Sequence, residues 1–199
     1  MEQGAARVRS ELLPDISPER PFVLVVEIFQ KGGYKTSPFN CVGNYIATYP
    51  ERVISKLVIT PGHDGLVTSV TEDIRAIDGT PPVVRSLVDD SIITGPLEDP
   101  CPPEEYTQPE GRWDVVPWVD AQLDAAAHAE ELGHTFAGRS SLNGRPSFSY
   151  ERRTPASLSV LEFVEAEPLL SQESHYTVQD DGSLILESQT TVVSASAGE

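Results

Sequence analysis

Residues 52 to 94 decide the fold class, and they read RVISKLVITPGHDGLVTSVTEDIRAIDGTPPVVRSLVDDSIIT. Three strand-like runs rich in β-branched residues occupy this stretch, at 52–60, 66–77 and 82–94. Residues 61–65 join the first two runs, and Asp78-Gly79-Thr80 joins the second to the third. An Asp-Gly pair between apolar runs indicates a tight hairpin, because glycine accepts the positive φ that such a turn needs. The stretch therefore predicts an antiparallel meander.

Six more strand-like runs lie on either side of this meander, at 22–29, 42–49, 146–152, 157–166, 175–179 and 183–193. Asp180-Asp181-Gly182 joins the last two runs as another hairpin signal. One helix is predicted over 119–132, with Asp120 as its N-cap, an alanine-rich middle and Gly133 as its stop.

These elements predict an all-β, mainly antiparallel fold: a single small β-barrel of about eight or nine strands with one α-helix. A closed barrel is favoured because it leaves no unpaired strand edges. We expect residues 1–20 to form a flexible N-terminal arm or cap, 21–194 the barrel domain and 195–199 a tail. The proline-rich loop at 95–112 is either a lid or a surface excursion.

Composition restricts the partners that the protein can bind. The 199 residues carry a net charge of −17, which disfavours nucleic acid and anionic membrane surfaces because both are negatively charged. No apolar run approaches the roughly 20 residues that cross a bilayer, and no secretory signal is recognisable at the start. We therefore expect a cytoplasmic protein in which Cys41 and Cys101 are reduced. The sequence leaves open whether the protein forms a homodimer.

Strand alternation places three carboxylates on otherwise apolar faces. Glu72 alternates with Val70 and Ile74, and Glu27 and Glu162 have similar apolar neighbours two residues away. An inward carboxylate is costly unless it is paired or protonated, and a protonated one suits a general acid. The alternatives are a one-residue error in the predicted register or structural pairing with an arginine.

Aromatic side chains suggest a cavity lined by rings. Phe148, Tyr150 and Tyr176 are predicted to point inward, where they suit a flat, mostly apolar ligand or simply form a core. Trp113 and Trp118 flank the start of the helix and either rim the pocket or pack the helix onto the barrel. We take Glu72, Tyr150 and Tyr176 as catalytic candidates, and Glu27, Phe148, Glu162, Trp113 and Trp118 as substrate-binding candidates.

No motif for a metal or a cofactor has a workable spacing. His128 and His134 are six residues apart, so they do not share a helical face as a zinc pair four apart would. Gly-x-Ser-x-Gly and glycine-rich phosphate loops are both missing from the sequence. We therefore predict neither a metal nor a cofactor.

The strand layout, the inward aromatics and the two loop-like segments resemble small β-barrels of the lipocalin and allene-oxide-cyclase kind. Among these are barrel cyclases of bacterial natural-product pathways, and the resemblance is one of layout without a matched motif. It implies a cofactor-free cyclase or isomerase that folds a hydrophobic, polyketide-like molecule for ring closure. A non-catalytic carrier barrel and a β-sandwich structural or interaction protein are the alternatives.

Overall fold

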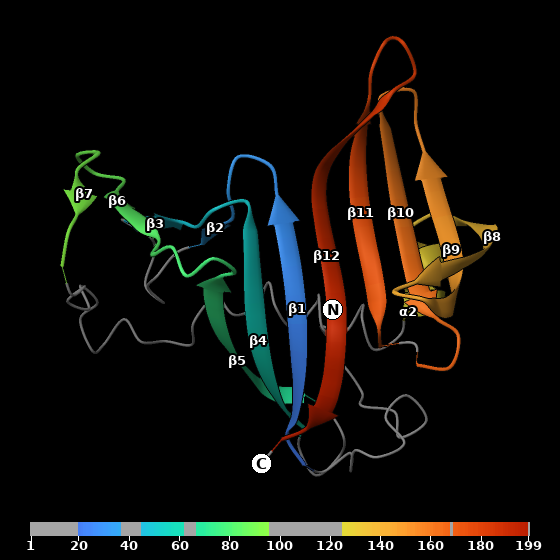
Figure 1. The fold of residues 1–199 in the computed structure, drawn as a ribbon, viewed down its shortest axis with the longest axis horizontal. Coiled ribbons are helices and arrows are strands. Elements are labelled where there is room, and N and C mark those ends of the chain that lie inside the picture. The colour runs from blue at the N-terminus through green and yellow to red at the C-terminus, as the bar shows by residue number, and fades with distance from the viewer. Residues whose placement is uncertain (1–19, 37–44, 62–66, 96–124, 168, 199) are drawn as a thin grey trace, which may run out of the picture.

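The computed structural model describes residues 20–36, 45–61, 67–95, 125–167 and 169–198. Eight strands form the main sheet, in the order β5-β4-β1-β12-β11-β10-β9-β8 (Figure 1). Their bounds are β1 Phe22–Gln30, β4 Arg52–Pro61, β5 Val67–Ala76, β8 Thr135–Leu142, β9 Arg145–Arg153, β10 Ser157–Val164, β11 Ser171–Val178 and β12 Leu184–Ala197.

A smaller sheet of four strands has the order β2-β3-β6-β7. Its strands are β2 Lys35–Thr36, β3 Tyr45–Thr48, β6 Val83–Ser86 and β7 Ile92–Ile93. The helix α2 spans Ala125–Glu131, at the end of the molecule where β8 and β9 lie (Figure 1).

The structure confirms the predicted fold class, because every strand pairing in the described part of the chain is antiparallel and only one short helix accompanies the strands. The main sheet is barrel-like but open. Its order ends at β5 on one side and β8 on the other, and these two strands do not pair within the described residues.

The main core follows from alternation along β1 and β4. Phe22, Leu24 and Val26 are fully buried on one face of β1, and their cross-strand partners Ile59, Leu57 and Ser55 are buried beside them. Burying a large aliphatic or aromatic side chain contributes roughly 1.5–3 kcal/mol. The same cluster takes in Val192 of β12 and Leu169 and Leu170 before β11, so it joins the two ends of the chain.

Several predicted elements differ from those observed. The predicted meander over 52–94 is correct for β4 and β5 but wrong beyond them, because β6 pairs with β3 and β7 in the smaller sheet and not with β5. The run at 82–94 divides into β6 and β7, because residues 87–89 form a turn. Strand β12 continues to Ala197, which pairs with Phe22, so most of the predicted tail belongs to the sheet. The arm before Arg20, the loop after Gly95 and helix residues 119–124 lie outside the described residues.

The sequence prediction missed the short strand β2 and the longer strand β8. Strand β8 pairs with β9 through a turn at Asn143 and Gly144, which have φ of 50° and 77°. Asn-Gly in this conformation is the strongest short hairpin signal, and it was available in the sequence. The polar residues of β8, TFAGRSSL, obscured the strand because most of its side chains are exposed.

Two adjacent glycines link β1 to the smaller sheet, and only one of them is packed. Both have positive φ, 80° at Gly32 and 94° at Gly33. A Cβ on Gly33 would lie 2.6 Å from the carbonyl oxygen of Tyr49, whereas a Cβ on Gly32 would meet nothing within 4 Å. The backbone of the link therefore tolerates a side chain at Gly32 far better than at Gly33.

We expect Gly32→Ala to lower the free energy of unfolding by about 1–2 kcal/mol, the cost of a left-handed non-glycine residue. Gly33→Ala should lose about 1–3 kcal/mol more, because the new methyl group overlaps backbone that cannot rotate away. Urea unfolding followed by circular dichroism measures both. Equal losses would show that the close approach to Tyr49 is relieved by movement.

Candidate functional site: an aromatic face beside a buried histidine

Four rings gather on one face of the main sheet, and we call Phe136, Phe148, Tyr150 and Phe163 the aromatic face. The register brings them together, because Phe136 pairs with Tyr150 and Phe148 pairs with Phe163. Tyr150 stacks on Phe163 at a centroid distance of 5.5 Å, and Phe148 meets Phe163 edge-on at 5.8 Å. Phe136 contacts both Phe148 and Tyr150 edge-on, at 6.1 and 5.5 Å. Such pairs gain stability beyond the area that they bury.

The aromatic face is closed at one end and open at the other. Phe163 is buried, together with Leu161 and with Ala129 of α2. Phe148 and Tyr150 are half-buried, and Phe136 is 57% exposed. The rings therefore lead from the core to solvent, which leaves aromatic surface available for contact with a ligand.

A polar row lies directly beside the rings, and its members are His134, Arg152, Ser159 and His175. Arg152 pairs with Ser159 across β9 and β10, and Ser159 pairs with His175 across β10 and β11. The neighbouring row contains Tyr150, Leu161 and Glu173, so the two rows share one face of the sheet. His134 joins the polar row through a hydrogen bond of 2.9 Å between its Nε2 and Ser159 Oγ.

The end of α2 places His134 at this position. The amide of Gly133 donates to Glu130 O at 3.0 Å, and the amide of His134 donates to Ala129 O at 2.8 Å. With φ of 77° at Gly133, these two bonds form a Schellman motif, in which the residue after the glycine turns back onto the helix. Arg152 Nη1 also donates to Leu132 O at 3.0 Å and so fixes the helix end to β9.

His134 is neutral and incompletely paired. It is only 5% exposed, and burial, helped by the nearby positive charge of Arg152, lowers its pKa below the ordinary value. Its Nδ1 is buried and has no hydrogen-bond partner among the described residues. A buried nitrogen without a partner is costly, so His134 would gain from a further polar contact.

Glu173 and His175 form an ion pair at the other end of the polar row. His175 Nε2 lies 3.1 Å from Glu173 Oε1. This bond raises the pKa of His175 and lowers the pKa of Glu173. The face thus combines an imidazole that protonates less readily than usual, an imidazole that protonates more readily than usual, and a carboxylate with a lowered pKa.

His134 and Ser159 are hydrogen-bonded as a catalytic base and its serine nucleophile would be, but a substrate cannot reach the serine. A catalytic serine must reach its substrate, and Ser159 is 5% exposed. The pair therefore serves as polar support beneath the face more readily than as a reacting dyad.

The structure brings together only part of the predicted site. Phe148 and Tyr150 lie on the aromatic face, as predicted. The prediction that Tyr176 lies with them is wrong. Tyr176 pairs with Leu158, which is three residues before Leu161 on β10, so its side chain is on the opposite face of the sheet.

The three predicted inward carboxylates are not buried together. Glu27 and Glu162 alternate with the core residues Val26 and Leu161 and so lie on the opposite face of the sheet, which makes the prediction of inward acids wrong for these two. Glu72 is exposed. Glu72 does lie on the expected face, because it pairs with buried Leu57 and accepts a hydrogen bond of 2.7 Å from Ser55. It is exposed because β5 ends the order of the main sheet, with no paired strand on its outer side among the described residues.

Tyr34 is one of two tyrosines whose pKa the charge of Glu72 helps to raise. Burial and, secondarily, the charge of Glu72 raise the pKa of Tyr34 to about 12. This part of the molecule is far from the aromatic face in the sheet, since five strands separate β5 from β9. Glu72 and Tyr150 therefore belong to different places on the sheet.

Trp113 and Trp118, with Cys41 and Cys101, lie outside the described residues. Within the described ranges, no group of three or more histidine, cysteine or acidic side chains is arranged to hold a metal ion. No helix in those ranges is long and apolar enough to cross a membrane.

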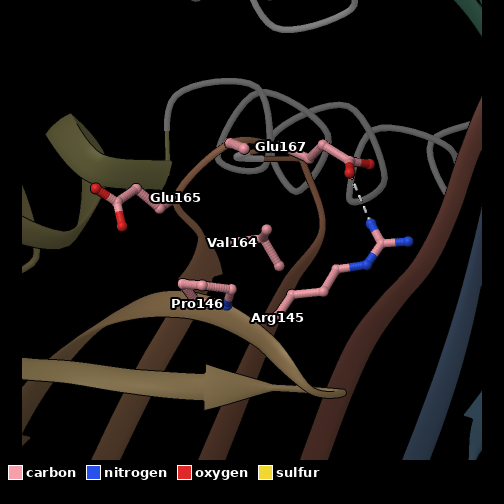
Figure 2. Close-up of a pocket in the computed structure, with 6 residues that line it drawn as sticks. Arg145, Pro146, Val164, Glu165 and Glu167 are labelled. Carbon is pink, nitrogen blue, oxygen red and sulfur yellow. Dashed lines mark hydrogen bonds and ion pairs between the residues drawn. The ribbon is translucent and has the colours of Figure 1, made fainter.

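A hollow of about 360 Å³ lies near the start of β9 (Figure 2). Arg145, Pro146, Val164, Glu165, Ala166 and Glu167 line it. Its acidic side chains are paired, Glu167 with Arg145 at 2.8 Å and Glu165 with Arg139 at 3.3 Å. None of the four rings lines this hollow, and its charged groups already have partners, so the aromatic face is the better candidate site.

Sequence reasoning missed His134, Ser159 and Glu173 and placed His175 only at a rim. Gly133 was read as the helix stop, and a Schellman motif would have directed attention to the next residue, His134. The cross-strand neighbours Ser159 and His175 could not be found in the same way, because their pairing depends on the register of β10 and β11.

No known family model matches the chain, and no curated protein matches its sequence. Two solved structures are similar in part: MucB in complex with MucA(peri), at a TM-score of 0.39 and 14% identity, and the MucA/MucB complex of Pseudomonas aeruginosa, at 0.40 and 16%. Each match covers 92% of this chain and 52% or 53% of the other, so the chain spans about half the length of those proteins. Similarity at this level does not bear on function.

We expect His175 to titrate above its ordinary pKa of 6.5, because Glu173 stabilises the protonated ring. Glu173→Gln should lower the pKa of His175 toward that value. Nuclear magnetic resonance titration of the histidine ring protons measures both. An unchanged His175 pKa in the variant would contradict the ion pair.

The two histidines should also act oppositely on stability. The His175 pair stabilises the fold fully below the unfolded pKa, and this contribution is lost as pH rises through the folded pKa. His134 has a lowered pKa, so its contribution is present above pH 6.5 and is lost as pH falls toward the folded pKa. Glu173→Gln should therefore make stability fall more steeply than in the wild type between pH 7.5 and about pH 6.

Proposed function

We propose that this chain binds a hydrophobic small molecule bearing a ring or a conjugated chain, on the aromatic face. The observation that carries the proposal is the run of four contacting rings that starts at buried Phe163 and ends at Phe136, which is 57% exposed. Exposing a large ring to water is unfavourable, and a flat apolar ligand would cover it.

The polar row supports the same proposal because it supplies contacts that orient a ligand. Binding sites for small molecules are mainly apolar, with a few polar groups that fix orientation. Here His175, Glu173 and Arg152 border the rings. A ligand with one polar end would therefore have a preferred direction on the face.

Phe136→Ala tests the proposal because the exposed ring can be removed with little effect on the core. We expect the dissociation constant for the dye 1-anilinonaphthalene-8-sulfonate, measured by fluorescence, to rise about tenfold, as the loss of one aromatic contact of about 1.4 kcal/mol implies. Leu184→Ala is the matched control, since Leu184 is also an exposed apolar residue but lies on β12. Equal affinity of wild type and Phe136→Ala would refute binding at this face.

The cyclase or isomerase activity that the strand layout implies stays a prediction. Of its three catalytic candidates, Tyr150 alone lies on the aromatic face, where its ring stacks on Phe163. Ring closure there would depend on holding the substrate in a reactive shape, with the Tyr150 hydroxyl polarising a carbonyl.

Tyr150→Phe separates a carrier from an enzyme. It keeps the stacked ring, so dye affinity should stay within about twofold, a change of less than 1 kcal/mol. A linear polyene ketone incubated with the protein and followed by mass-resolved chromatography reports ring closure. Turnover by the wild type that Tyr150→Phe loses would establish catalysis, and no turnover by either protein would leave the carrier function alone.

A further inference from the structure

The turn between β6 and β7 exposes an unusual amount of aliphatic surface. Nine large hydrophobic side chains are exposed in the described part of the chain, and five of them fall between residues 77 and 92. These five are Ile77, Val83, Leu87, Val88 and Ile92. We call Val83, Leu87, Val88 and Ile92 the hairpin patch. Val88 at 76% and Leu87 at 60% are the most exposed of the nine, and both occupy the tip.

The register explains why the patch faces outward. Ile92 pairs with Arg85, so Val83, Arg85 and Ile92 share one face of the smaller sheet. The other face carries Val84 and Ser86, which are buried. One face of the hairpin therefore supports the fold, and the other presents aliphatic side chains to solvent.

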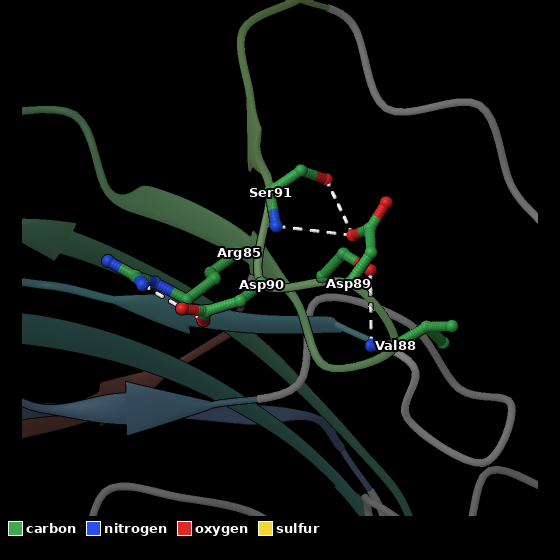
Figure 3. A network of polar contacts seen from close by, with 6 residues as sticks. Arg85, Val88, Asp89, Asp90 and Ser91 are labelled. Atoms are coloured by element: carbon green, nitrogen blue, oxygen red, sulfur yellow. Dashed lines mark hydrogen bonds and ion pairs between the residues drawn. The ribbon is translucent and has the colours of Figure 1, made fainter.

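The hairpin tip is well connected, so its aliphatic side chains are held in place (Figure 3). Asp89 Oδ1 accepts hydrogen bonds from the backbone amide and the hydroxyl of Ser91, at 3.1 and 2.7 Å. The amide of Val88 donates to Ser86 Oγ at 3.2 Å, and Arg85 forms an ion pair of 2.9 Å with Asp90. A turn fixed in this way presents Leu87 and Val88 at little further entropic cost to a partner.

The surroundings of the patch are acidic. Five carboxylates and two arginines lie between residues 72 and 95. Both arginines are already paired, Arg75 with Asp73 and Arg85 with Asp90. Hydrogen bonds from Ser91 lower the pKa of Asp89, and those from Thr80 lower the pKa of Asp78, so both carboxylates stay ionised at neutral pH. A partner must therefore supply positive charge as well as apolar surface.

We propose that the hairpin patch docks an extended segment of a partner protein in which aliphatic and basic residues alternate. The aliphatic side chains would cover Val83, Leu87, Val88 and Ile92, and the basic ones would meet Asp89 at the tip. Strand β7 stands at the edge of the four-stranded sheet, where an extended segment can lie alongside it. Charge complementarity distinguishes this partner from an apolar ligand, which would gain nothing from the carboxylates.

The test uses three fluorescein-labelled ten-residue peptides, alternating lysine–valine, lysine–serine and glutamate–valine, with fluorescence anisotropy as the readout. We expect the lysine–valine peptide to bind the wild-type chain, the lysine–serine peptide to bind at least about tenfold more weakly, and the glutamate–valine peptide not to bind. The double substitution Leu87→Ser with Val88→Ser should raise the dissociation constant of the lysine–valine peptide about tenfold. Asp89→Asn should raise it about threefold and reduce its dependence on salt.

Leu184→Ser with Ile185→Ser is the matched control, because it removes two exposed aliphatic side chains from β12 without changing charge. It should leave peptide binding unchanged. Equal binding of the lysine–valine and lysine–serine peptides, or equal losses in the two double variants, would overturn the proposal. So would a wild-type dimer that Leu87→Ser with Val88→Ser converts to a monomer, because a second copy of this chain would then be the occupant.

Discussion

The pairing of β1 with β12 is the constraint on which the rest of the structure depends. In the main sheet β5, β4 and β1 form one antiparallel group, and β12, β11, β10, β9 and β8 form another. Within each group neighbouring strands pair antiparallel, and β1 and β12 alone join the groups in the described part of the chain. Phe22 pairs with Ala197, so this pairing brings together residues near the two ends of the chain. Such long-range pairing has a loop-closure entropy cost, which the burial of the core then offsets.

The two candidate surfaces lie on different groups of strands, and this has a physical consequence. The aromatic face belongs to β8, β9 and β10, whereas the hairpin patch belongs to the smaller sheet connected to β1, β4 and β5. A ligand on the rings and a partner on the hairpin would share no residue. Coupling between them would have to pass through the β1–β12 pairing and the core cluster that includes Leu24 and Val192.

Charge is distributed unevenly over these surfaces. The net charge is −17, yet the hairpin of β8 and β9 carries Arg139, Arg145, Arg152 and Arg153. Arg139 lies 5.8 Å from the centroid of the Phe148 ring, and Arg152 borders the polar row. The surroundings of the aromatic face therefore combine arginines with the carboxylates that pair with them, whereas the carboxylates near the hairpin patch outnumber its arginines.

The sequence by itself determined the local chemistry. Runs of β-branched residues indicated most of the strands, and the Asp-Gly pairs between β4 and β5 and between β11 and β12 do join paired strands, because these signals depend on residues close together in the chain. Asp78-Gly79 did not predict a hairpin correctly, since β5 and β6 lie in different sheets. Strand alternation put Phe148 and Tyr150 on one face, and Gly133 marked the end of α2 correctly.

The tertiary structure alone decided which strands are neighbours and which strand stands at an edge. Glu72 lies on the predicted face but is exposed, because no described strand pairs with the outer edge of β5. Tyr176 was predicted on the same face as Tyr150 but lies on the opposite one. The register between strands that are far apart in sequence cannot be deduced from the residues of either strand alone. The row of His134, Ser159 and His175 exists for the same reason. Three segments that carry no shared motif meet only when the sheet fixes their register and the Schellman motif turns His134 onto it.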